Sequence, residues 1–496
     1  MKNVVSRRRF LQLGATTLAG AGSALWLPGC SDGKDNTAGL SQFCLNNPLP
    51  QDAQGRWWLS NNYAPVFEER DEMNLKVVGD LPRALSGLYA RIGSNMADTE
   101  HWFLGHGMFH GVRLEEGRAL WYRNRYIHTA LREAGTDELT PTDPVSSYSN
   151  VAPIYHAGRL FTMGEIGLPY ETNPADLSTV GVYNFNGALG GSMTAHPKID
   201  PLTGDMLFFG YDFRPPFLTY YRATAAGELV EAKPITLPAS VMMHDFAITQ
   251  RYVIFYDLPI AFNFNMAAAG SRFPFSWDFD HVPRMGVMPR DGGDQDIQWF
   301  EVSPNFVFHT MNAFDNPADG NEIILHVARI NGPFWGESNL DFSEIGFLTE
   351  YRFDLAAGTV SENIISDIPQ DFGQVNRSLW GQPYRYGYGM DFSVRGEGTA
   401  LARPVGIVRH DHQTGNSESM QPGDHLSLEE AIFVADPESS GEQDGWLMCY
   451  AYNANRCASE LLIFDARDFG AAPVARVELP ARVPHGFHGV WVPDAT

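Results

Sequence analysis

The chain of 496 residues contains little cysteine, little positive charge and no long helical period after its N-terminus. Four cysteines are too few for a disulfide framework; they are Cys30, Cys44, Cys449 and Cys457. With 35 Lys and Arg against 59 Asp and Glu, the formal net charge is −24. This acidity excludes electrostatic binding of nucleic acid as a main role. The cysteine pairing stays open, although modification of Cys30 would leave an odd number and at least one unpaired thiol.

The N-terminus has the pattern of an export signal. Ser6-Arg7-Arg8-Arg9-Phe10-Leu11 and the apolar stretch Leu11–Leu27 resemble a twin-arginine signal. The stretch is short and rich in Gly, Ala and Thr, which argues against a permanent transmembrane helix. The following Leu27-Pro28-Gly29-Cys30-Ser31 resembles a lipobox in which Cys30 becomes the lipidated first residue. Plain signal cleavage is the alternative, because proline is atypical in such a motif.

These features divide the chain into three expected segments. We expect an export signal of lipoprotein type at 1–30, a flexible polar tether at 31–45, and one domain at 46–496. The protein is then expected in the periplasm, either free or as a membrane-anchored lipoprotein.

Short apolar and aromatic runs, separated by Gly, Asn or Asp, recur along the domain and are typical of β-hairpins. We expect hairpins at Ile154–Glu165, Leu218–Val230, Thr349–Val360 and Trp446–Phe464. Many hairpins without long helices indicate a sandwich, a barrel or a propeller, and a body of about 450 residues favours the propeller.

Four of the 15 histidines lie far apart in the sequence, each at the edge of a β-like segment: His196, His244, His309 and His488. Any single histidine is more often a hydrogen-bonded strand or loop residue than a metal ligand. An all-histidine site suits iron, copper, zinc or nickel rather than magnesium or calcium. Spacing alone does not select these four histidines, but their surroundings do.

Those surroundings resemble the carotenoid cleavage oxygenases, from about Leu81-Pro82 to the C-terminus and with the motifs in family order. The motifs are Arg91-Ile92-Gly93, Gly105–His110, His156–Leu160, Gly164-Glu165, Ala195–Lys198, Met243–Thr249, Phe308–Ala313, and Phe487–Gly489 with Trp491. The resemblance implies an all-β fold, a seven-bladed β-propeller with a loop and helical cap over the axial face that bears iron.

The same resemblance implies the chemistry. One Fe(II) per chain would be held by the four histidines, and O2 would cleave a C=C bond of a carotenoid or apocarotenoid into two carbonyl products. No catalytic side chain beyond the iron centre is implied. The partners would be O2 and a lipophilic polyene.

The family also implies three acidic residues that orient the ligands through their second ring nitrogens. Glu165 and Glu430 fit two of these positions, and Glu429 leaves an ambiguity of one residue at the second. The third position holds Asp371, where glutamate is more usual. Aspartate is one methylene shorter, so its contact is expected to run through water or a shifted backbone.

Two further positions bear on the substrate. Stilbene-cleaving relatives carry a lysine just before the first acidic residue, and this chain has Gly164, which offers neither charge nor a side-chain donor. Val151 stands where some relatives place a threonine near the open iron site, and it has a similar volume without the hydroxyl. A carotenoid or apocarotenoid is therefore favoured, and a stilbene or other aryl alkene is the alternative. A non-enzymatic propeller would require the loss of a ligand, and all four are present.

Aromatic residues crowd the region Ile260–Phe279, which is either a cap on the core or the apolar mouth of a substrate tunnel. Phe262, Phe264 and Phe308 are therefore candidate pocket residues, as are the two positions above. In the family, lipophilic substrate enters through an apolar patch near the membrane, and a lipid on Cys30 would place the body there.

Two nearby histidines are not expected to bind the metal. His485 stands three residues before His488, and residues three apart on a strand face opposite sides of the sheet. His106 lies in a glycine-rich stretch, where relatives usually have aspartate.

Overall fold

The computed structural model describes residues 44, 48–140, 142–333, 344–393 and 404–494. The predicted export signal, with Cys30, and the predicted tether up to residue 43 lie outside the described residues. No helix within the described ranges has the length and apolar character needed to cross a membrane. The described α-helices are the short α2 (Ala130–Glu133) and α3 (Phe264–Ala268). Short 3-10 turns lie at Trp57–Leu59, Asn61–Tyr63, Phe185–Gly187, Asp294–Asp296, Arg377–Leu379 and Ala466–Asp468.

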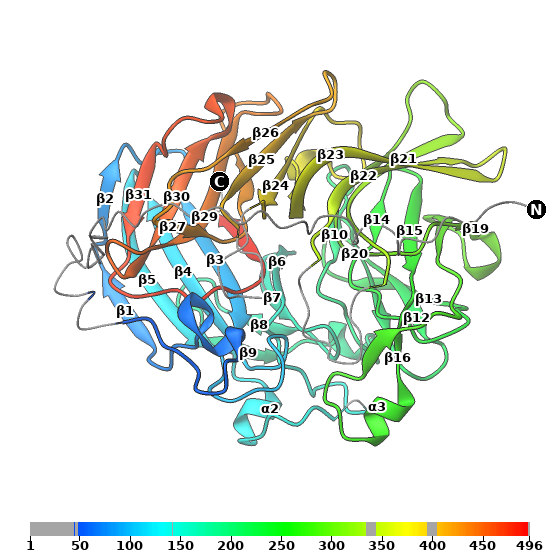
Figure 1. Ribbon diagram of the computed structural model, residues 1–496, viewed down its shortest axis with the longest axis horizontal. Helices are drawn as coiled ribbons and strands as arrows, with labels where there is room; N and C mark the ends of the chain where they lie inside the picture. Colours follow the sequence, from blue (N-terminus) through cyan, green and yellow to red (C-terminus); the bar gives the residue numbers. More distant parts are fainter. Residues whose placement is uncertain (1–43, 45–47, 141, 334–343, 394–403, 495–496) are drawn as a thin grey trace, which may run out of the picture. The chain divides into compact units, whose positions relative to one another are not determined.

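Antiparallel strands make up almost all of the regular structure (Figure 1). In spatial order, one sheet contains β1 (Arg70–Met73), β5 (Arg118–Tyr126), β4 (Gly107–Glu115), β3 (Gly87–Ser94) and β32 (Gly489–Pro493). Three four-stranded sheets follow: β6 (Ala152–His156), β7 (Arg159–Met163), β8 (Tyr170–Thr172) and β9 (Thr179–Val182); β10 (Lys198–Ile199), β11 (Met206–Tyr211), β12 (Leu218–Ala223) and β13 (Leu229–Ile235); β14 (Ala247–Ile248), β15 (Tyr252–Asp257), β18 (Arg284–Pro289) and β19 (Gln298–Glu301).

The remaining strands form two larger sheets and a ribbon. One sheet contains β20 (Asn305–Asp315), β21 (Glu322–Asn331), β22 (Phe347–Asp354), β23 (Thr359–Gln374), β24 (Tyr386–Asp391), β25 (Gly406–Asp411) and β26 (Asn416–Met420). The other contains β2 (Lys76–Gly79), β31 (Ala475–Glu478), β30 (Ala458–Asp465), β29 (Gly445–Asn453), β27 (Leu426–Leu428) and β28 (Ile432–Ala435). The ribbon pairs β16 (Ile260–Phe262) with β17 (Phe275–Trp277).

The long strand β23 belongs to two groups of strands. Residues 359–369 pair with β22, and residues 370–374 pair with β24. We interpret the large sheet as two units that share β23, so that seven antiparallel units follow one another along the chain. The all-β fold is confirmed, whereas the division into seven blades stays a prediction.

The two ends of the described chain meet in shared sheets. Strand β3 pairs with β32, with Arg91 opposite Gly489, and β2 pairs with β31. In Figure 1 the blue β2 lies beside the orange-red β31. The first and last sheets are therefore completed only when strands from opposite ends of the chain associate.

All four predicted hairpins are present, formed by β6–β7, β12–β13, β22–β23 and β29–β30. The first turns at Ala157-Gly158, where φ is +50° and +76°. Two central residues with positive φ are typical of a type I′ turn, whose twist matches that of the flanking strands.

Apolar side chains are buried between neighbouring sheets. One cluster joins Ile254 of β15 to Leu325 of β21, and another joins Tyr122 of β5 to Leu461 of β30. All four side chains are almost completely buried. This packing holds adjacent sheets against each other, and with them the connecting segments in which three of the four histidines lie.

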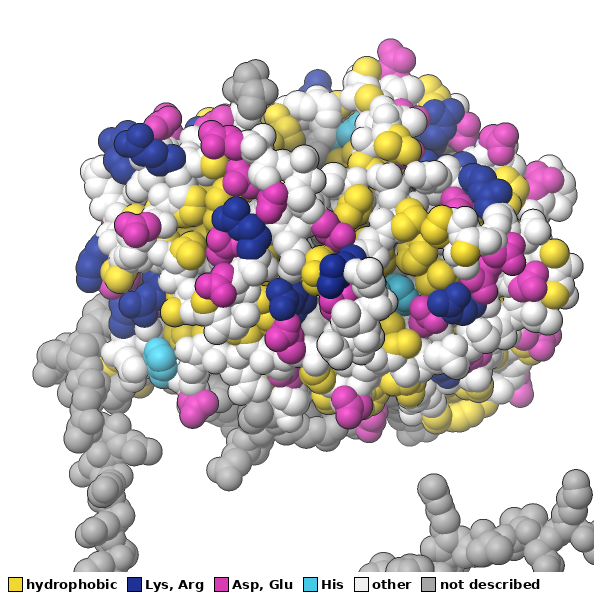
Figure 2. All heavy atoms as spheres, turned by 90° about the horizontal axis from the view of Figure 1, so that it is seen from above, with side chains coloured by type: hydrophobic (Ala, Val, Ile, Leu, Met, Phe, Trp, Pro, Cys, Tyr) yellow, Lys and Arg dark blue, Asp and Glu magenta, His cyan; other side chains and the backbone are white. Residues whose placement is uncertain are grey.

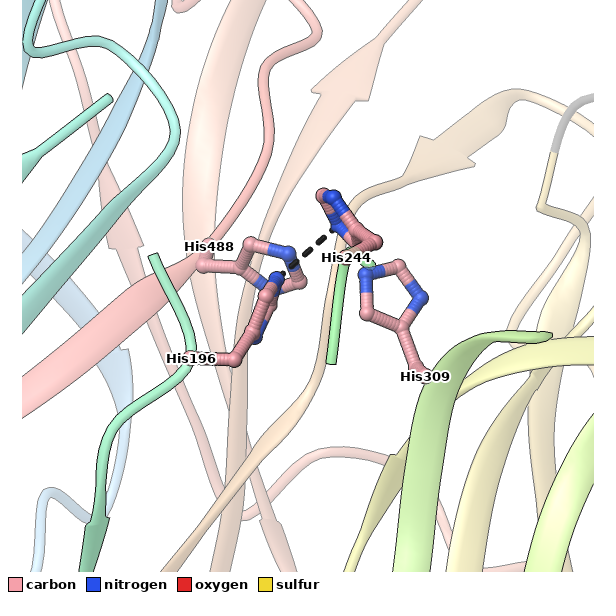
Figure 3. A group of neighbouring side chains, drawn as sticks. All are labelled: His196, His244, His309 and His488. Carbon is pink, nitrogen blue, oxygen red and sulfur yellow. Dashed lines mark hydrogen bonds between the residues drawn. The ribbon is translucent and has the colours of Figure 1, made fainter. Parts of the chain in front are cut away.

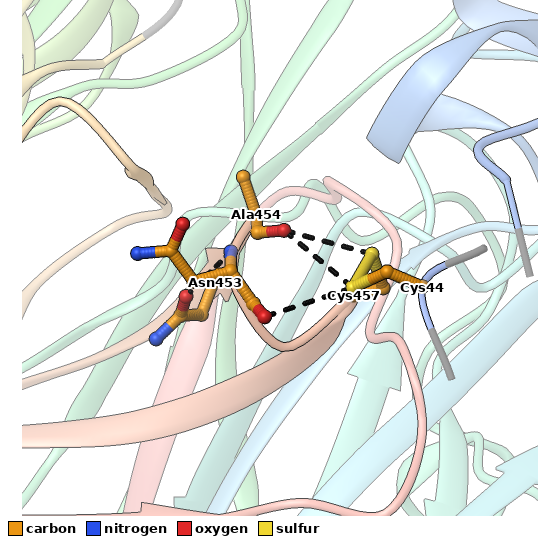
Figure 4. Close-up of a disulfide and its surroundings, with 5 residues drawn as sticks. Cys44, Asn453, Ala454 and Cys457 are labelled. Atoms are coloured by element: carbon orange, nitrogen blue, oxygen red, sulfur yellow. Dashed lines mark hydrogen bonds between the residues drawn. A yellow bond between two sulfur atoms is a disulfide. The ribbon is translucent and has the colours of Figure 1, made fainter. Parts of the chain in front are cut away.

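A disulfide joins Cys44 to Cys457, in the turn between β29 and β30 (Figure 4). Cys449, on β29, is buried and unpaired. Cys44, within the predicted tether of residues 31–45, is thus joined to the domain, and the expected segment boundaries stay a prediction.

The surface carries both signs of charge. On the face shown in Figure 2, basic side chains lie among acidic and apolar ones. This face is therefore not uniformly acidic, although the whole chain carries an excess of negative charge.

Candidate metal centre

Four histidine side chains converge on one point (Figure 3). His196 lies just before β10, His244 just before β14 and His488 directly before β32. These three positions agree with the expected strand edges. His309 instead lies inside β20, which corrects the expectation for that residue.

A β-bulge explains how a histidine inside a strand reaches the centre. The pairing of β20 with β21 shifts register between Val307 and Thr310, so His309 stands where the ladder is interrupted. A bulge bends the strand and re-aims the side chain at the extra residue.

The spacing of the four imidazoles suits one metal ion. One ligand atom from each histidine can be chosen so that all four lie within 4.8 Å of one another. The Nε2 atoms of His196 and His244 are 2.9 Å apart. Imidazole nitrogens lie about 2.0–2.1 Å from a bound zinc ion, so ligands on opposite sides of such an ion are about 4.2 Å apart. Small shifts would let the four nitrogens share one ion.

The protonation of two of the four histidines also suits a metal. Burial and the neighbouring histidines hold the pKa of His196 and of His309 well below the usual range, so both rings are neutral near pH 7. Burial also lowers the pKa of His244, but the Glu165 carboxylate outweighs it and the net pKa is raised. His309 Nε2 is buried without a hydrogen-bond partner. A neutral imidazole with an unused lone pair is the form that binds a metal.

Three carboxylates hold the other ring nitrogens of three histidines. His244 Nδ1 lies 3.0 Å from Glu165 Oε2, and His309 Nδ1 lies 2.9 Å from Asp371 Oδ1. His488 Nδ1 lies 2.9 Å from Glu430 Oε1. A carboxylate at Nδ1 fixes the tautomer and leaves Nε2 free for a metal.

The ambiguity between the two adjacent glutamates is resolved by their contacts. Glu430 binds His488 and also accepts the backbone N–H of Gly489 at 2.7 Å. Glu429 forms a buried ion pair with Arg91 instead.

Asp371 reaches its histidine directly, without an intervening water. Phe372, the next residue, has φ of +58° and donates its backbone N–H to Asp371 Oδ1 at 2.8 Å. A Cβ on Gly373 would lie 2.7 Å from the Cα of Met311, so this part of β23 approaches β20 unusually closely. The contact therefore does not run through water; it is direct, with Phe372 in the left-handed region and Gly373 packed against Met311.

The two histidines set aside from the sequence lie outside the cluster. His485 precedes β32 in a segment without regular structure, so the strand geometry invoked for it does not apply. It is kept apart by its own contacts, since its Nε2 lies 3.0 Å from Ser427 Oγ. His106 is not among the clustered residues either.

A cavity of about 700 Å³ leads to the four-histidine cluster, and its volume is typical of a site for a small organic molecule. His244, His309 and His488 lie in its wall. Most of the lining is apolar or aromatic, including Trp102, Leu104, Phe213, Phe273, Phe392 and Phe487.

Four of the five predicted pocket residues line this cavity: Val151, Gly164, Phe262 and Phe308. Phe264 does not line it and is 64% exposed, so the prediction for that residue is wrong. The reason is that Phe264 begins α3, whose turn directs it outward while Ala267 of the same helix lines the cavity. The region Ile260–Phe279 thus forms part of the cavity wall rather than only a cap.

Comparison with known proteins adds the family. The family model described as "Retinal pigment epithelial membrane protein" matches residues 63–493. The chain belongs to the carotenoid cleavage oxygenase family. It is 34% identical to a carotenoid 9,10(9',10')-cleavage dioxygenase of Crocus sativus, over 88% of this chain and 89% of that protein.

Solved structures of family members resemble this fold closely. A lignostilbene dioxygenase of Pseudomonas brassicacearum has a TM-score of 0.80 at 27% identity, covering 90% of this chain and 99% of that one. A variant of the apocarotenoid oxygenase of Synechocystis has a TM-score of 0.77 at 27% identity, covering 87% and 98%.

Two residues of this family member's centre were missed from the sequence. Tyr211 donates its hydroxyl to Glu165 Oε1 at 3.0 Å, and Gln374 donates Nε2 to Glu430 Oε1 at 2.9 Å. Both hold the carboxylates that orient the histidines. For Tyr211 the only signal was a hydroxyl at the end of the apolar strand β11, which is common and therefore weak, and for Gln374, at the end of the largely polar β23, there was none.

Proposed function

We propose that this chain is an iron(II) dioxygenase that cleaves a C=C bond of a carotenoid or apocarotenoid with O2 into two carbonyl products. The observation that carries the proposal is the convergence of four histidines at the wall of a large apolar cavity. Membership in the family supports it, as do the names of two relatives, a carotenoid cleavage dioxygenase and an apocarotenoid oxygenase.

His196, His244, His309 and His488 would hold the iron, one ion per chain. When bound there, iron(II) would supply the activation of O2, with which singlet alkenes otherwise react slowly. The protein's own residues orient the histidines and the alkene and exclude water. Glu165, Asp371 and Glu430 orient His244, His309 and His488 through Nδ1, while the aromatic wall would hold the alkene and exclude water.

Gly164 supports a polyene rather than a hydroxystilbene. It lines the cavity next to Glu165 and carries no donor for a phenolic oxygen. A Cβ at Gly164 would lie 2.7 Å from Ser147 Oγ, and Ser147 is completely buried. The lysine found in stilbene-cleaving relatives therefore does not fit here without movement of Ser147.

Exposed acidic residues occur in the cavity lining at Glu100, Glu138 and Glu344. We place the mouth of the cavity near these residues, because charged groups remain hydrated there while the apolar part of the substrate is buried further inside. An apolar chain gains about 25 cal/mol for each Å² that it buries against the wall.

Product analysis tests the proposal. Purified protein with iron is incubated in air with a panel of carotenoids, apocarotenals and hydroxystilbenes, and the products are identified by mass spectrometry. We expect two carbonyl fragments from a carotenoid or apocarotenal. A kcat/KM that favours a hydroxystilbene by about tenfold, equivalent to about 1.4 kcal/mol, would overturn the substrate assignment. Full turnover with zinc in place of iron would overturn the assignment of iron as the metal.

We also propose that the protein is exported by the twin-arginine route to the periplasm. The disulfide between Cys44 and Cys457 supports an oxidising compartment. Replacing Arg7 and Arg8 together by lysine should retain the protein in the cytoplasm, as cell fractionation would show. Periplasmic protein with Cys44 and Cys457 reduced would remove this support.

Lipidation of Cys30 stays a prediction, and mass measurement of the mature N-terminus decides it.

A further inference from the structure

A single buried carboxylate connects the segments of three histidines at the metal centre. Asp245 directly follows His244 and is 1% exposed. Its Oδ1 lies 2.7 Å from Lys198 Nζ, and its Oδ2 accepts the backbone N–H of Thr310 at 2.8 Å. Both oxygens therefore bind groups from other parts of the chain.

Each partner of Asp245 stands beside another histidine of the cluster. Lys198 lies two residues after His196, and Thr310 directly follows His309. The three segments belong to different sheets, headed by β10, β14 and β20. Asp245 thus ties together histidine segments that no shared strand pairing holds in register.

The contact with Thr310 also supports the bulge that aims His309. Thr310 lies at the register shift of β20, where the ladder with β21 is irregular. A buried backbone N–H without an acceptor would destabilise the fold at this point, and Asp245 supplies the acceptor. The Thr310 hydroxyl is held in turn, 2.7 Å from the hydroxyl of Tyr256.

We propose that Asp245 is a positioning residue that fixes His196, His244 and His309 relative to one another through Lys198 and Thr310. The inference rests on the proposed metal site and gives Asp245 no contact with substrate. Asp245 and its two partners line a second cavity, of about 80 Å³, together with three of the four histidines. Asp245, Lys198 and Thr310 do not line the large cavity.

A buried ion pair can also serve the fold alone, since removing one partner leaves the other charge buried. The experiment must therefore separate metal geometry from stability. The readouts are the rate at which a chelator removes the metal from folded protein, and the visible absorption spectrum of Co²⁺ bound in place of iron, which reports ligand geometry.

Asp245→Asn keeps the size of the side chain but places an amide donor against Lys198 or Thr310. We expect metal loss at least about tenfold faster than in wild type, an altered Co²⁺ spectrum, and a lower kcat with KM unchanged. Lys198→Met should shift metal loss in the same direction by less, and Lys198→Arg should restore retention because it keeps the charge.

Asp257→Asn is the matched control. Asp257 is completely buried, lies 2.7 Å from Arg284 Nε and 2.9 Å from His281 Nε2, and lines neither cavity. It should lower stability while its metal is lost at the wild-type rate.

The outcomes distinguish two failures. Wild-type protein that binds no metal would overturn the proposed function. Wild-type protein that retains metal, together with Asp245→Asn that loses it no faster than Asp257→Asn, would overturn the positioning role. If Asp245→Asn does not fold, equal metal retention in Lys198→Met and Lys198→Arg overturns it instead.

Discussion

Two groups of histidines in this protein use their ring nitrogens in opposite ways. In the metal centre, three rings bind carboxylates through Nδ1, and the Nε2 atoms of His196 and His244 face each other. In a second group, which we call the stacked cluster, the rings of His326 and His412 lie parallel, 4.3 Å apart at 6°, beside His410.

In the stacked cluster, protein groups occupy both ring nitrogens of His326 and of His410, and only His412 keeps a buried Nε2 without a partner. His326 binds the Tyr384 hydroxyl at 2.6 Å through Nδ1 and Glu350 at 3.1 Å through Nε2. His410 binds the Gln370 carbonyl oxygen and the Ser417 hydroxyl, both at 2.7 Å. Proximity of histidines therefore does not make a metal site. Lone pairs directed at a common point do.

The largest expected effect breaks the metal centre itself. His244→Ala or His309→Ala should lower iron from about one ion per chain to near zero and abolish cleavage, because an all-imidazole site with one ligand missing binds weakly. Metal analysis of folded protein checks this.

His410→Ala provides the contrast. It removes two hydrogen bonds from the stacked cluster and should cost about 1–3 kcal/mol of unfolding free energy with iron content unchanged. His485→Ala and His106→Ala should also retain iron. Iron loss in any of these three variants would mean that the distinction between the two groups is wrong.

A smaller effect is expected at the carboxylates. Glu165→Gln, Glu430→Gln and Asp371→Asn should each weaken iron retention or turnover by about 10–100-fold. Asp371 is included because its contact with His309 is direct. As a control, Glu350→Gln alters the acid beside His326 and should leave iron retention unchanged. The rate at which a chelator removes iron measures retention in all four variants.

A third prediction concerns the wall of the cavity beside the centre. Gly164→Lys should lower kcat/KM for an apocarotenal, because its Cβ would meet Ser147 and its side chain would enter the cavity next to Glu165. Iron content should remain close to that of wild type. An unchanged kcat/KM would show that Ser147 moves freely and that Gly164 does not limit the substrate.

The last prediction tests the stacked cluster through the dependence of stability on pH. Burial, together with His326, lowers the pKa of His410 to about 3 and of His412 to about 2. The unfolded chain takes up protons at the ordinary pKa of 6.5, so it binds more protons than the folded state below that pH. Stability is therefore full above pH 6.5 and falls toward pH 3, by up to about 1.4 kcal/mol per pH unit for each histidine.

Urea unfolding of metal-free protein at pH 7 and pH 5 measures this slope. His410→Gln should make the loss between the two pH values smaller than in wild type. An equal loss in both proteins would mean that His410 is not held neutral by the fold.

The sequence was sufficient for the site where a residue's neighbours along the chain define it. The four histidines and Glu165 lie in local motifs, and hairpins follow from local alternation and turn residues. Sequence reasoning was insufficient where the backbone conformation determines which side chains meet. The direct contact of Asp371 depends on the positive φ of Phe372 and on the close packing of Gly373, which no pattern of side chains encodes.

Long-range partners were also beyond reach. Nothing local pairs Cys44 with Cys457, which are 413 residues apart. Phe264 was misplaced because an aromatic-rich segment does not reveal which side of a short helix faces the cavity. The position of His309 inside β20 required knowledge of a bulge in the pairing with β21.

The pairing of β3 with β32 has a consequence for the order of folding. His488 takes its place only when its strand joins one from the opposite end of the chain, whereas His196, His244 and His309 lie on consecutive stretches. Contacts between distant segments form slowly, because loop closure costs entropy before the contact gives any stability. We therefore expect the fourth imidazole to arrive last, so that tight metal uptake reports a completed fold rather than a partly folded chain.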